Sequence, residues 1–176
     1  MIGLKDLSYK SCYSVFCGAG ISVNSGIPIV VTLQSYLLRK LGIPDNNIEL
    51  ILNSGMPFEV FMETINELSD ISALLCIFDV GQPNHTHKFL ANEIRRGRVS
   101  CVLTTNFDCH LETALTEVGL IEGEDFRVIH DEFQSVNLEA ESLICPLIVK
   151  LHGCYRKTAQ LGIVMNIVDP ENWTMC

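Results

Sequence analysis

Short apolar runs alternate along the chain with longer segments whose apolar residues recur every three or four positions. Four of the runs have the length of strands: residues 13–17, 99–103, 126–129 and 143–151. Strands that are apolar on both sides are typical of a parallel sheet whose two faces are both covered. Because helical segments separate the runs, the pattern predicts an α/β fold, with a parallel sheet and helices on both faces.

The intervening segments predict five helices. Their apolar periodicity begins near Val31, Asp45, Pro57, Asn84 and Asp108. Asp45 and Asn84 are expected to cap their helices, and Pro57 suits a first helical position. Glycines follow four of the segments and mark where those helices end: Gly42, Gly55, Gly97 and Gly119.

The third of these helices carries an apolar stripe that has two interpretations. The members of the stripe are spaced by three or four residues: Phe58, Phe61, Met62, Ile65 and Leu68. Such a stripe can form the wall of a cofactor site, but on most helices it packs into the hydrophobic core. We therefore expect these residues to belong to the core.

Length and composition indicate one globular domain. The 176 residues correspond to a single domain, residues 1–176, whose tail at 154–176 is the least defined part and holds one further strand candidate at 162–168. Apolar residues make up 48% of the chain and the mean hydropathy is +0.28, which excludes a disordered chain. This hydropathy is high for a lone domain, so we expect a covered partner surface or a larger fold.

The charge balance bears on the partners. Twelve Lys and Arg residues against 21 Asp and Glu residues give a net charge of −9, which argues against a surface for nucleic acid or for an anionic membrane. No stretch approaches the roughly 20 uninterrupted apolar residues of a membrane helix, and the N-terminus lacks the layout of a signal peptide. The sequence thus predicts a cytoplasmic location.

Eight cysteines raise the question of metal and redox chemistry. None of them is spaced as Cys-x-x-Cys, so neither a zinc site nor a thioredoxin-like pair is expected. Several lie inside apolar runs, as Cys101 and Cys145 do. The favoured interpretation is that they are reduced thiols that pack as small hydrophobic residues.

Polar clusters follow three of the predicted strands. Residues 18–22 (Gly-Ala-Gly-Ile-Ser), residues 104–108 (Thr-Thr-Asn-Phe-Asp) and the pair at 152–153 (His-Gly) each stand at the carboxyl end of a strand. In open parallel sheets, ligands bind beyond these ends. We therefore expect the three clusters to contribute to one site.

Each cluster alone also allows a structural interpretation. Gly18 and Gly20 would let a phosphate approach the backbone, but Gly-x-Gly also occurs in plain turns. Asp108 is either a catalytic carboxylate or a helix cap, and His152 is either a general base or a structural histidine. A dinucleotide fingerprint needs a third glycine where Val23 stands, which disfavours an ordinary hydride-transferring dehydrogenase.

Together with one further segment, these clusters resemble the motifs of sirtuins. Residues 18–28 look like the opening Gly-Ala-Gly motif of that family, and residues 83–90 resemble its Pro-Asn-x-x-His-x-x-Leu segment. Residues 104–108 resemble its Thr-Gln-Asn-Ile-Asp loop, and residues 151–153 resemble the strand that carries its catalytic histidine. Four motifs in the same order over residues 12–155 are specific, where any one alone would be weak.

The resemblance implies a Rossmann-like fold that binds NAD and breaks its nicotinamide–ribose bond. By position, the residues that would hold the diphosphate are Gly18, Ala19, Gly20 and Ser22. The ribose and nicotinamide pocket would be lined by Thr105, Asn106 and Asp108. His152 would be the general base on a ribose hydroxyl or on water, with Asn106 and Asp108 as the other catalytic residues. Polar groups placed there would stabilise the oxocarbenium-like ribose that bond cleavage develops.

Departures from the family pattern point away from protein deacylation. Protein-deacylating sirtuins continue Gly-Ile-Pro with Asp-Phe-Arg, whereas this chain has Ile29, Val30 and Val31. Thr105 replaces the usual Gln, and the Cys-x-x-Cys pairs of the zinc module are absent from the sequence. These features look more like the sirtuin-like NAD hydrolases of bacterial antiphage defence, in which water captures the ribose. The favoured function is hydrolysis of NAD, without zinc.

Two other functions stay open at this point. One is an NAD-dependent protein lysine deacylase, and the other is a non-catalytic domain that senses NAD or ADP-ribose. The later sirtuin strands, which hold the adenosine half of NAD, have no recognisable counterpart in the sequence. The resemblance therefore implies a truncated domain, with a fused effector domain or a homo-oligomer in the full-length protein.

Overall fold

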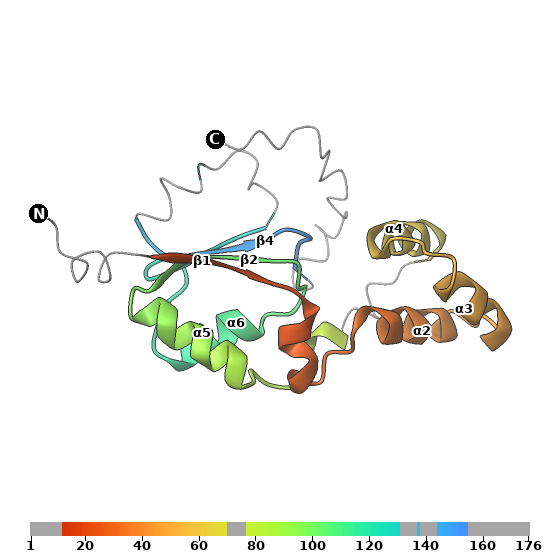
Figure 1. Ribbon diagram of the computed structural model, residues 1–176, viewed down its shortest axis with the longest axis horizontal. Coiled ribbons are helices and arrows are strands. Elements are labelled where there is room, and N and C mark those ends of the chain that lie inside the picture. Colours follow the sequence, from red (N-terminus) through yellow and green to blue (C-terminus); the bar gives the residue numbers. More distant parts are fainter. Residues whose placement is uncertain (1–11, 70–76, 131–136, 138–143, 155–176) are drawn as a thin grey trace, which may run out of the picture.

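A parallel sheet of four strands lies at the centre of the computed structural model (Figure 1). The structure describes residues 12–69, 77–130, 137 and 144–154. Neighbouring strands are all parallel and follow the order β1-β2-β4-β3. The bounds of the strands are β1 (Tyr13–Cys17), β2 (Val99–Thr104), β3 (Arg127–Ile129) and β4 (Leu147–Lys150). The predicted parallel α/β sheet, with its Rossmann-like character, is confirmed.

Two helices cover one face of the sheet, α5 (His85–Arg95) and α6 (His110–Glu117) (Figure 1). Side chains of both helices meet alternate residues of β2 and β4 in one buried cluster, which includes Leu90, Ala91, Ile94, Val102, Leu111, Ala114, Leu115 and Ile148. The intervening strand residues point to the other face, where Cys101, Leu147 and Val149 are also buried. In the described part of the chain, helices pack against the first face only.

Helix α5 begins where the sequence predicts. The Asn84 side chain accepts hydrogen bonds from the backbone N–H groups of Thr86 (2.9 Å) and His87 (3.4 Å). In return, the N–H of Asn84 donates to Nδ1 of His87 at 3.2 Å, which completes a capping box. The expectation that Asn84 is the N-cap is confirmed.

The expected cap at Asp45 is wrong. Helix α3 (Asp45–Leu52) takes Pro44 as its N-cap, in extended conformation, and the Asp45 side chain makes no capping bond. The Asp45 carboxylate instead accepts a hydrogen bond from Nε of Arg39 at 3.1 Å. A similar shift moves Pro57 to the N-cap of α4 (Phe58–Leu68), one residue before the first helical position.

A helical lobe lies beyond the carboxyl ends of the strands (Figure 1). It consists of α2 (Val30–Lys40), α3 and α4, whose core is a second buried cluster that includes Leu33, Leu37, Leu38, Ile48, Phe61, Met62 and Ile65. The core interpretation of the α4 stripe is therefore confirmed for its three central members. It is wrong for Leu68, which is 77% exposed.

A short 3₁₀ helix, η1 (Ala19–Ser25), connects β1 to this lobe. Gly26 ends it at φ 95°. Among the described residues, no single helix has the length and apolar composition of a membrane span; η1 and α2 reach these only together, across a bend of 69°.

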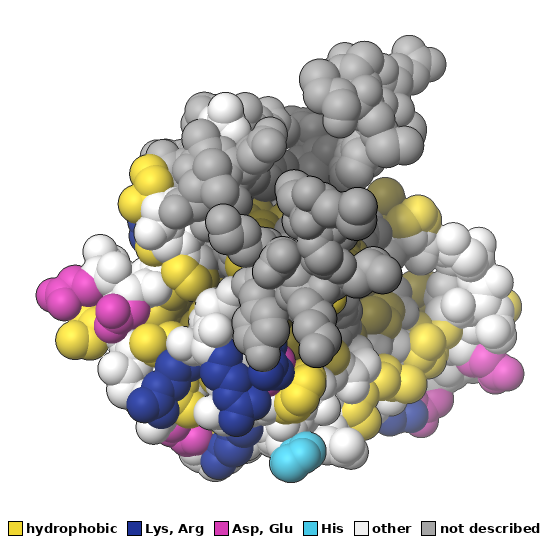
Figure 2. All heavy atoms as spheres, turned by 60° about the vertical axis from the view of Figure 1, so that its left-hand side comes forward, with side chains coloured by type: hydrophobic (Ala, Val, Ile, Leu, Met, Phe, Trp, Pro, Cys, Tyr) yellow, Lys and Arg dark blue, Asp and Glu magenta, His cyan; other side chains and the backbone are white. Residues whose placement is uncertain are grey.

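Exposed basic residues end α5. Arg96 and Arg98 donate to the two oxygens of Glu93 at 2.8 and 3.0 Å. Figure 2, in which the left-hand side of Figure 1 is turned forward, shows Lys and Arg side chains gathered on one face. The Glu93 carboxylate and the carboxyl end of the helix account for the positions of Arg96 and Arg98.

Candidate functional site

The carboxyl ends of β1, β2 and β4 lie side by side. In the strand register Cys17 pairs with Thr104, and Thr104 pairs with Lys150. Hydrogen bonds continue just past these ends, from the N–H of Thr105 to the carbonyl oxygen of Cys17 (3.2 Å) and from the N–H of Leu151 to that of Thr104 (2.8 Å). The three polar clusters therefore leave the sheet at one edge, as the sequence predicts.

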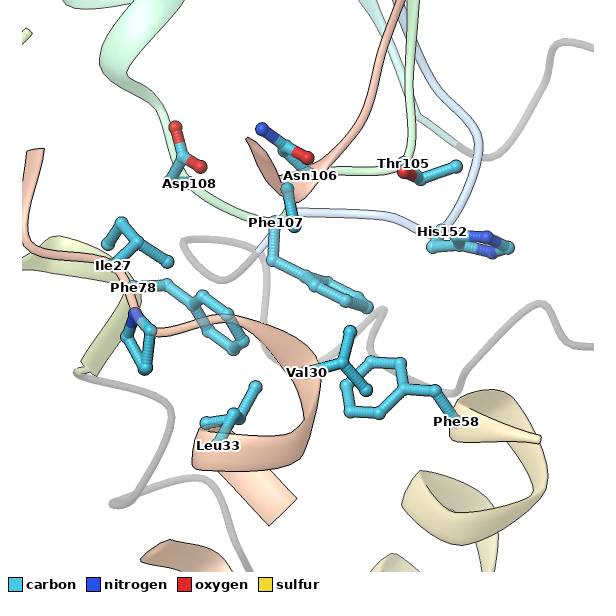
Figure 3. Close-up of a pocket in the computed structure, with 12 residues that line it drawn as sticks. Ile27, Val30, Leu33, Phe58, Phe78, Thr105, Asn106, Phe107, Asp108 and His152 are labelled. Carbon is cyan, nitrogen blue, oxygen red and sulfur yellow. The ribbon is translucent and has the colours of Figure 1, made fainter. Parts of the chain in front are cut away.

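A cavity of about 150 Å³ opens between this edge and the helical lobe (Figure 3). Five residues predicted for the site line it: Ala19, Thr105, Asn106, Asp108 and His152. The rest of the lining is apolar and comes from the lobe and its connections: Ile27, Pro28, Val30, Leu33, Phe58, Phe78 and Phe107. The cavity thus combines one polar wall with one apolar wall, which is the usual composition of a small-molecule site.

Aromatic rings build much of the apolar wall. The Phe107 ring lies 5.1 Å from that of Phe78 and 6.3 Å from that of Phe58, centroid to centroid. On its other side it stacks near the imidazole of His152 at 6.4 Å, with 26° between the planes. Phe107 therefore packs between the lobe and the loop after β4, so both help to shape the cavity.

Ser22 is the centre of a buried hydrogen-bond network behind the polar wall. Its Oγ donates to Oδ2 of Asp108 at 2.8 Å and accepts from Nδ2 of Asn106 at 3.0 Å. Nε2 of His87 lies 3.3 Å from the same oxygen. Ser22 is fully buried, so its position in this structure is that of a support for Asn106 and Asp108.

The protonation state of His87 follows from its neighbours. Its Nδ1 accepts the N–H of Asn84, so the proton of the neutral ring is on Nε2 and is donated to Ser22. Burial lowers the pKa of His87, and the nearby Asp108 carboxylate opposes that change. The network therefore holds a neutral imidazole at neutral pH.

The position of Asp108 is partly consistent with both earlier interpretations, a helix cap and a residue of the site. Its Oδ1 accepts the N–H of His110, the first residue of α6, at 3.1 Å, although the N-cap position itself is Cys109. Its Oδ2 belongs to the Ser22 network, and the residue also lines the cavity. The carboxylate thus fixes the start of α6 and faces the candidate site at once.

Asn106 presents an unused acceptor at the cavity. It is 7% exposed, and within the described part of the chain its Oδ1 has no hydrogen-bond partner, while Nδ2 is held by Ser22. A buried carbonyl oxygen without a partner is costly, and such groups are common where a ligand completes the bonding. Figure 3 shows the Asn106 carboxamide at the polar wall, between Asp108 and Thr105.

The glycine loop leaves room along its backbone. A Cβ added to Gly20 would meet no atom within 4 Å, and one on Gly18 would meet only Oγ1 of Thr105, at 3.7 Å. The packing of the protein therefore does not require glycine at either position. A ligand that approaches the backbone closely gives a reason for glycine there. This observation fits a diphosphate on residues 18–20.

Sequence reasoning did not assign His87 or the apolar wall to the site. His87 belongs to the motif at residues 83–90, and α5 buries it on the same face as Leu90, Ala91 and Ile94. In the described residues, no group of three or more His, Cys, Asp and Glu side chains converges as a metal site.

Comparison with known proteins defines the class. A family described as SIR2-like domain matches residues 100–166. The chain is 32% identical over 124 residues to the NAD-dependent protein deacylase of Desulfosudis oleivorans, an alignment that covers 70% of this chain and 44% of that relative. With the fold and the motifs, these matches show that the chain carries a sirtuin-like domain.

Proposed function

We propose that this domain binds NAD and hydrolyses its nicotinamide–ribose bond, which releases nicotinamide and ADP-ribose. The observation that carries the proposal is the convergence of Asn106, Asp108 and His152 on one cavity beside the glycine loop. Polar side chains that meet a half-apolar cavity at the strand ends suit a substrate with both a sugar and an aromatic ring.

The diphosphate, the nicotinamide ring and the adjoining ribose each have a complementary surface. The backbone of Gly18, Ala19 and Gly20 takes the diphosphate, because open space lies along it. The aromatic wall around Phe107 and Phe78 takes the nicotinamide ring. Thr105 borders the ribose, and Ser22 holds the polar wall in place from behind.

Cleavage of the nicotinamide–ribose bond places positive charge on the ribose. The electron pair of the C–N bond leaves with nicotinamide, and the ribose becomes electron-deficient. The Asp108 carboxylate and the free Oδ1 of Asn106 stabilise that ribose. His152 accepts a proton from water as the water oxygen bonds to the ribose carbon. The reaction balances: NAD and water give nicotinamide, ADP-ribose and one proton.

Hydrolysis is favoured over deacylation by the residues that follow Gly-Ile-Pro. Ile29, Val30 and Val31 are 51%, 37% and 57% exposed, and none has a polar group for positioning an acyl-lysine substrate. The relative named as an NAD-dependent protein deacylase supports the alternative, that this domain deacylates lysine. A third possibility is a sensor that binds NAD or ADP-ribose without turnover.

One assay separates these functions. The purified protein is incubated with NAD, with and without an acetyl-lysine peptide, and nicotinamide is measured by liquid chromatography. Release without peptide supports hydrolysis, and release that requires peptide supports deacylation. Calorimetric binding without release over hours supports the sensor.

Variants test the residue roles. Asn106→Ala and His152→Ala are each expected to lower nicotinamide release at least about 100-fold, with unchanged circular dichroism. His85→Ala alters an exposed histidine at the start of α5 and is the matched control. Full activity in either site variant would contradict the roles assigned here.

The wider setting belongs to the same proposal. We place the domain in antiphage defence in the cytoplasm, without zinc, and with a fused effector domain or a homo-oligomer as its partner. The chain aligns with 44% of the length of the curated relative that it matches.

A further inference from the structure

Two cysteines that the proposed function does not use are in contact beside the site. Sγ of Cys109 lies 3.2 Å from Sγ of Cys154, although 45 residues separate them. Cys109 is the N-cap of α6 and directly follows Asp108, and Cys154 lies two residues after His152. The pair therefore connects the two loops that carry these proposed catalytic residues.

A buried lysine completes the cluster. Nζ of Lys150 lies 3.8 Å from Sγ of Cys109 and 3.7 Å from Sγ of Cys154, and it pairs with the Glu112 carboxylate at 2.8 Å. Lys150 is 1% exposed. A cation this close to both sulfurs stabilises a thiolate. It also repels a metal ion, so the geometry favours redox chemistry over metal binding.

The cluster is buried but has a route to small solutes. Cys109 and Cys154 are 7% and 4% exposed. Cys109 also lines a second cavity of about 140 Å³, together with polar residues such as His110 and Thr113. That space admits a molecule of the size of water or hydrogen peroxide.

We propose that Cys109 and Cys154 form a reversible disulfide under oxidation by a hydroperoxide. In the first step, one of the two sulfurs, as a thiolate, attacks hydrogen peroxide: an S–O bond forms, the O–O bond breaks, the sulfur becomes a sulfenic acid, and the released hydroxide leaves as water with the proton that this thiol gave up. In the second step, the other sulfur attacks the sulfenic acid sulfur, and the sulfenic hydroxyl leaves as water with the proton of this second thiol. Two thiols lose two electrons and two protons, and one peroxide becomes two waters.

Opposing influences act on the reactivity of the two sulfurs. The hydrogen bond to Cys154 and, after it, burial raise the pKa of the Cys109 thiol. The thiolate, and not the thiol, attacks in both steps, and the Lys150 ammonium beside both sulfurs opposes this increase in pKa. The side chains then have to rotate only until the sulfurs reach bonding distance, roughly 2.05 Å.

The disulfide would tie the start of α6 to the loop after β4. This modification is separate from the proposed function, and it can be measured without NAD.

Mass spectrometry of the folded protein tests the proposal. The protein is treated with dithiothreitol or with hydrogen peroxide, remaining thiols are alkylated, and it is digested with trypsin and an enzyme that cleaves before Asp. Cleavage after Lys150 separates Cys154 from Cys145, and cleavage before Asp108 separates Cys109 from Cys101. We expect a linked Cys109–Cys154 peptide pair after peroxide, lost again with dithiothreitol.

Two variants sharpen the result. Cys109→Ser should abolish the linked pair, whereas Cys12→Ser, at an exposed cysteine, should leave it unchanged. The linked pair should also form in native buffer, with Cys17 and Cys101 still alkylated. Peroxide that oxidises other cysteines first, or a Cys109–Cys154 link that forms only in denaturant, would overturn the proposal. The mass spectrometry does not measure nicotinamide release. A failure of the disulfide proposal can therefore be told apart from a failure of the proposed function.

Discussion

Ser22 Oγ donates a 2.8 Å hydrogen bond to Oδ2 of Asp108, across 86 residues of sequence. The bond joins η1, which follows β1, to the loop that follows β2. The Ser22 hydroxyl also accepts a hydrogen bond from Nδ2 of Asn106 and faces Nε2 of His87. One hydroxyl therefore fixes the side chains of Asn106 and Asp108, the two predicted catalytic residues in that loop. The geometry of the polar wall thus depends on a residue that lies behind it.

Removing this hydroxyl should cost stability. Ser22→Ala leaves the buried Asp108 oxygen without a donor and leaves Asn106 Nδ2 without an acceptor, so we expect a loss of about 1–3 kcal/mol in the free energy of unfolding. Urea titration followed by circular dichroism measures it. Ser14→Ala removes an exposed hydroxyl from β1 and should change stability by less than about 0.5 kcal/mol. Equal effects of the two substitutions would contradict the network.

The buried His87 should make stability depend on pH below neutrality. Its pKa in the folded state is lowered from 6.5, chiefly by burial, so the unfolded chain takes up a proton at a higher pH than the folded one. The stabilising contribution is therefore complete above about pH 6.5 and declines as the pH falls below it.

Urea titrations at pH 7, 6 and 5 test this dependence. The wild type should lose stability over this range, and His87→Gln, which keeps an amide donor for Ser22, should lose less. His85→Gln alters an exposed histidine two residues away and should follow the wild type. A steeper loss in His87→Gln than in the wild type would refute the assignment of a neutral imidazole.

The Lys150–Glu112 pair should be far more important than the surface ion pairs. Lys150 is 1% exposed, and its Nζ also donates to the carbonyl oxygen of Asp108. Burial lowers the pKa of Lys150, but the Glu112 carboxylate and the neighbouring sulfurs raise it more, so its net direction is upward. Glu112→Gln would leave a buried ammonium without its counterion, at an expected cost of about 3–5 kcal/mol.

A second charge change provides the comparison. Glu112→Gln combined with Lys150→Met removes both charges and should recover part of the lost stability, as measured by urea titration. The exposed pair of Lys88 and Glu117, 3.2 Å apart, is the control: Glu117→Gln should cost no more than about 1 kcal/mol. If Glu112→Gln were equally mild, the lysine would not depend on this carboxylate.

Local signals in the sequence predict most of the elements, and their failures have local causes. Asn84 is predicted as a cap because Asn at that position accepts backbone N–H groups, and the structure confirms it. The prediction for Asp45 is wrong because Pro44, already extended, takes the N-cap one residue earlier. The existence of a helix depends on apolar spacing, whereas its boundaries depend on single backbone conformations.

The site is predictable in part because parallel strands bring their carboxyl ends together. That rule alone places Asn106, Asp108 and His152 at one edge. The strand rule does not predict that Phe58 lines the cavity. Phe58 belongs to the same apolar stripe as Phe61, yet Phe61 packs in the core and Phe58 reaches the cavity. The separation of the helical lobe from the sheet depends on packing between distant segments, which no local pattern encodes.

Gly81 fixes how the segment before α5 passes η1. Its φ is +81°, and a Cβ there would lie only 1.6 Å from the carbonyl oxygen of Ser25. This close approach lets Nδ2 of Asn84 reach the carbonyl oxygen of Ile21 at 2.6 Å, which in turn sets His87 against Ser22. Any side chain at position 81 must push the two backbones apart.

We therefore expect Gly81→Ala to cost more than about 3 kcal/mol in the free energy of unfolding, because backbone strain and the clash add. Gly123→Ala isolates the strain, since Gly123 has a similar φ of +89° but a Cβ added there would meet no atom within 4 Å, and it should cost about 1–2 kcal/mol. Urea titration of both variants gives the difference. Equal costs would show that η1 and the segment before α5 can separate freely, and the Ser22 network would then lose its structural basis.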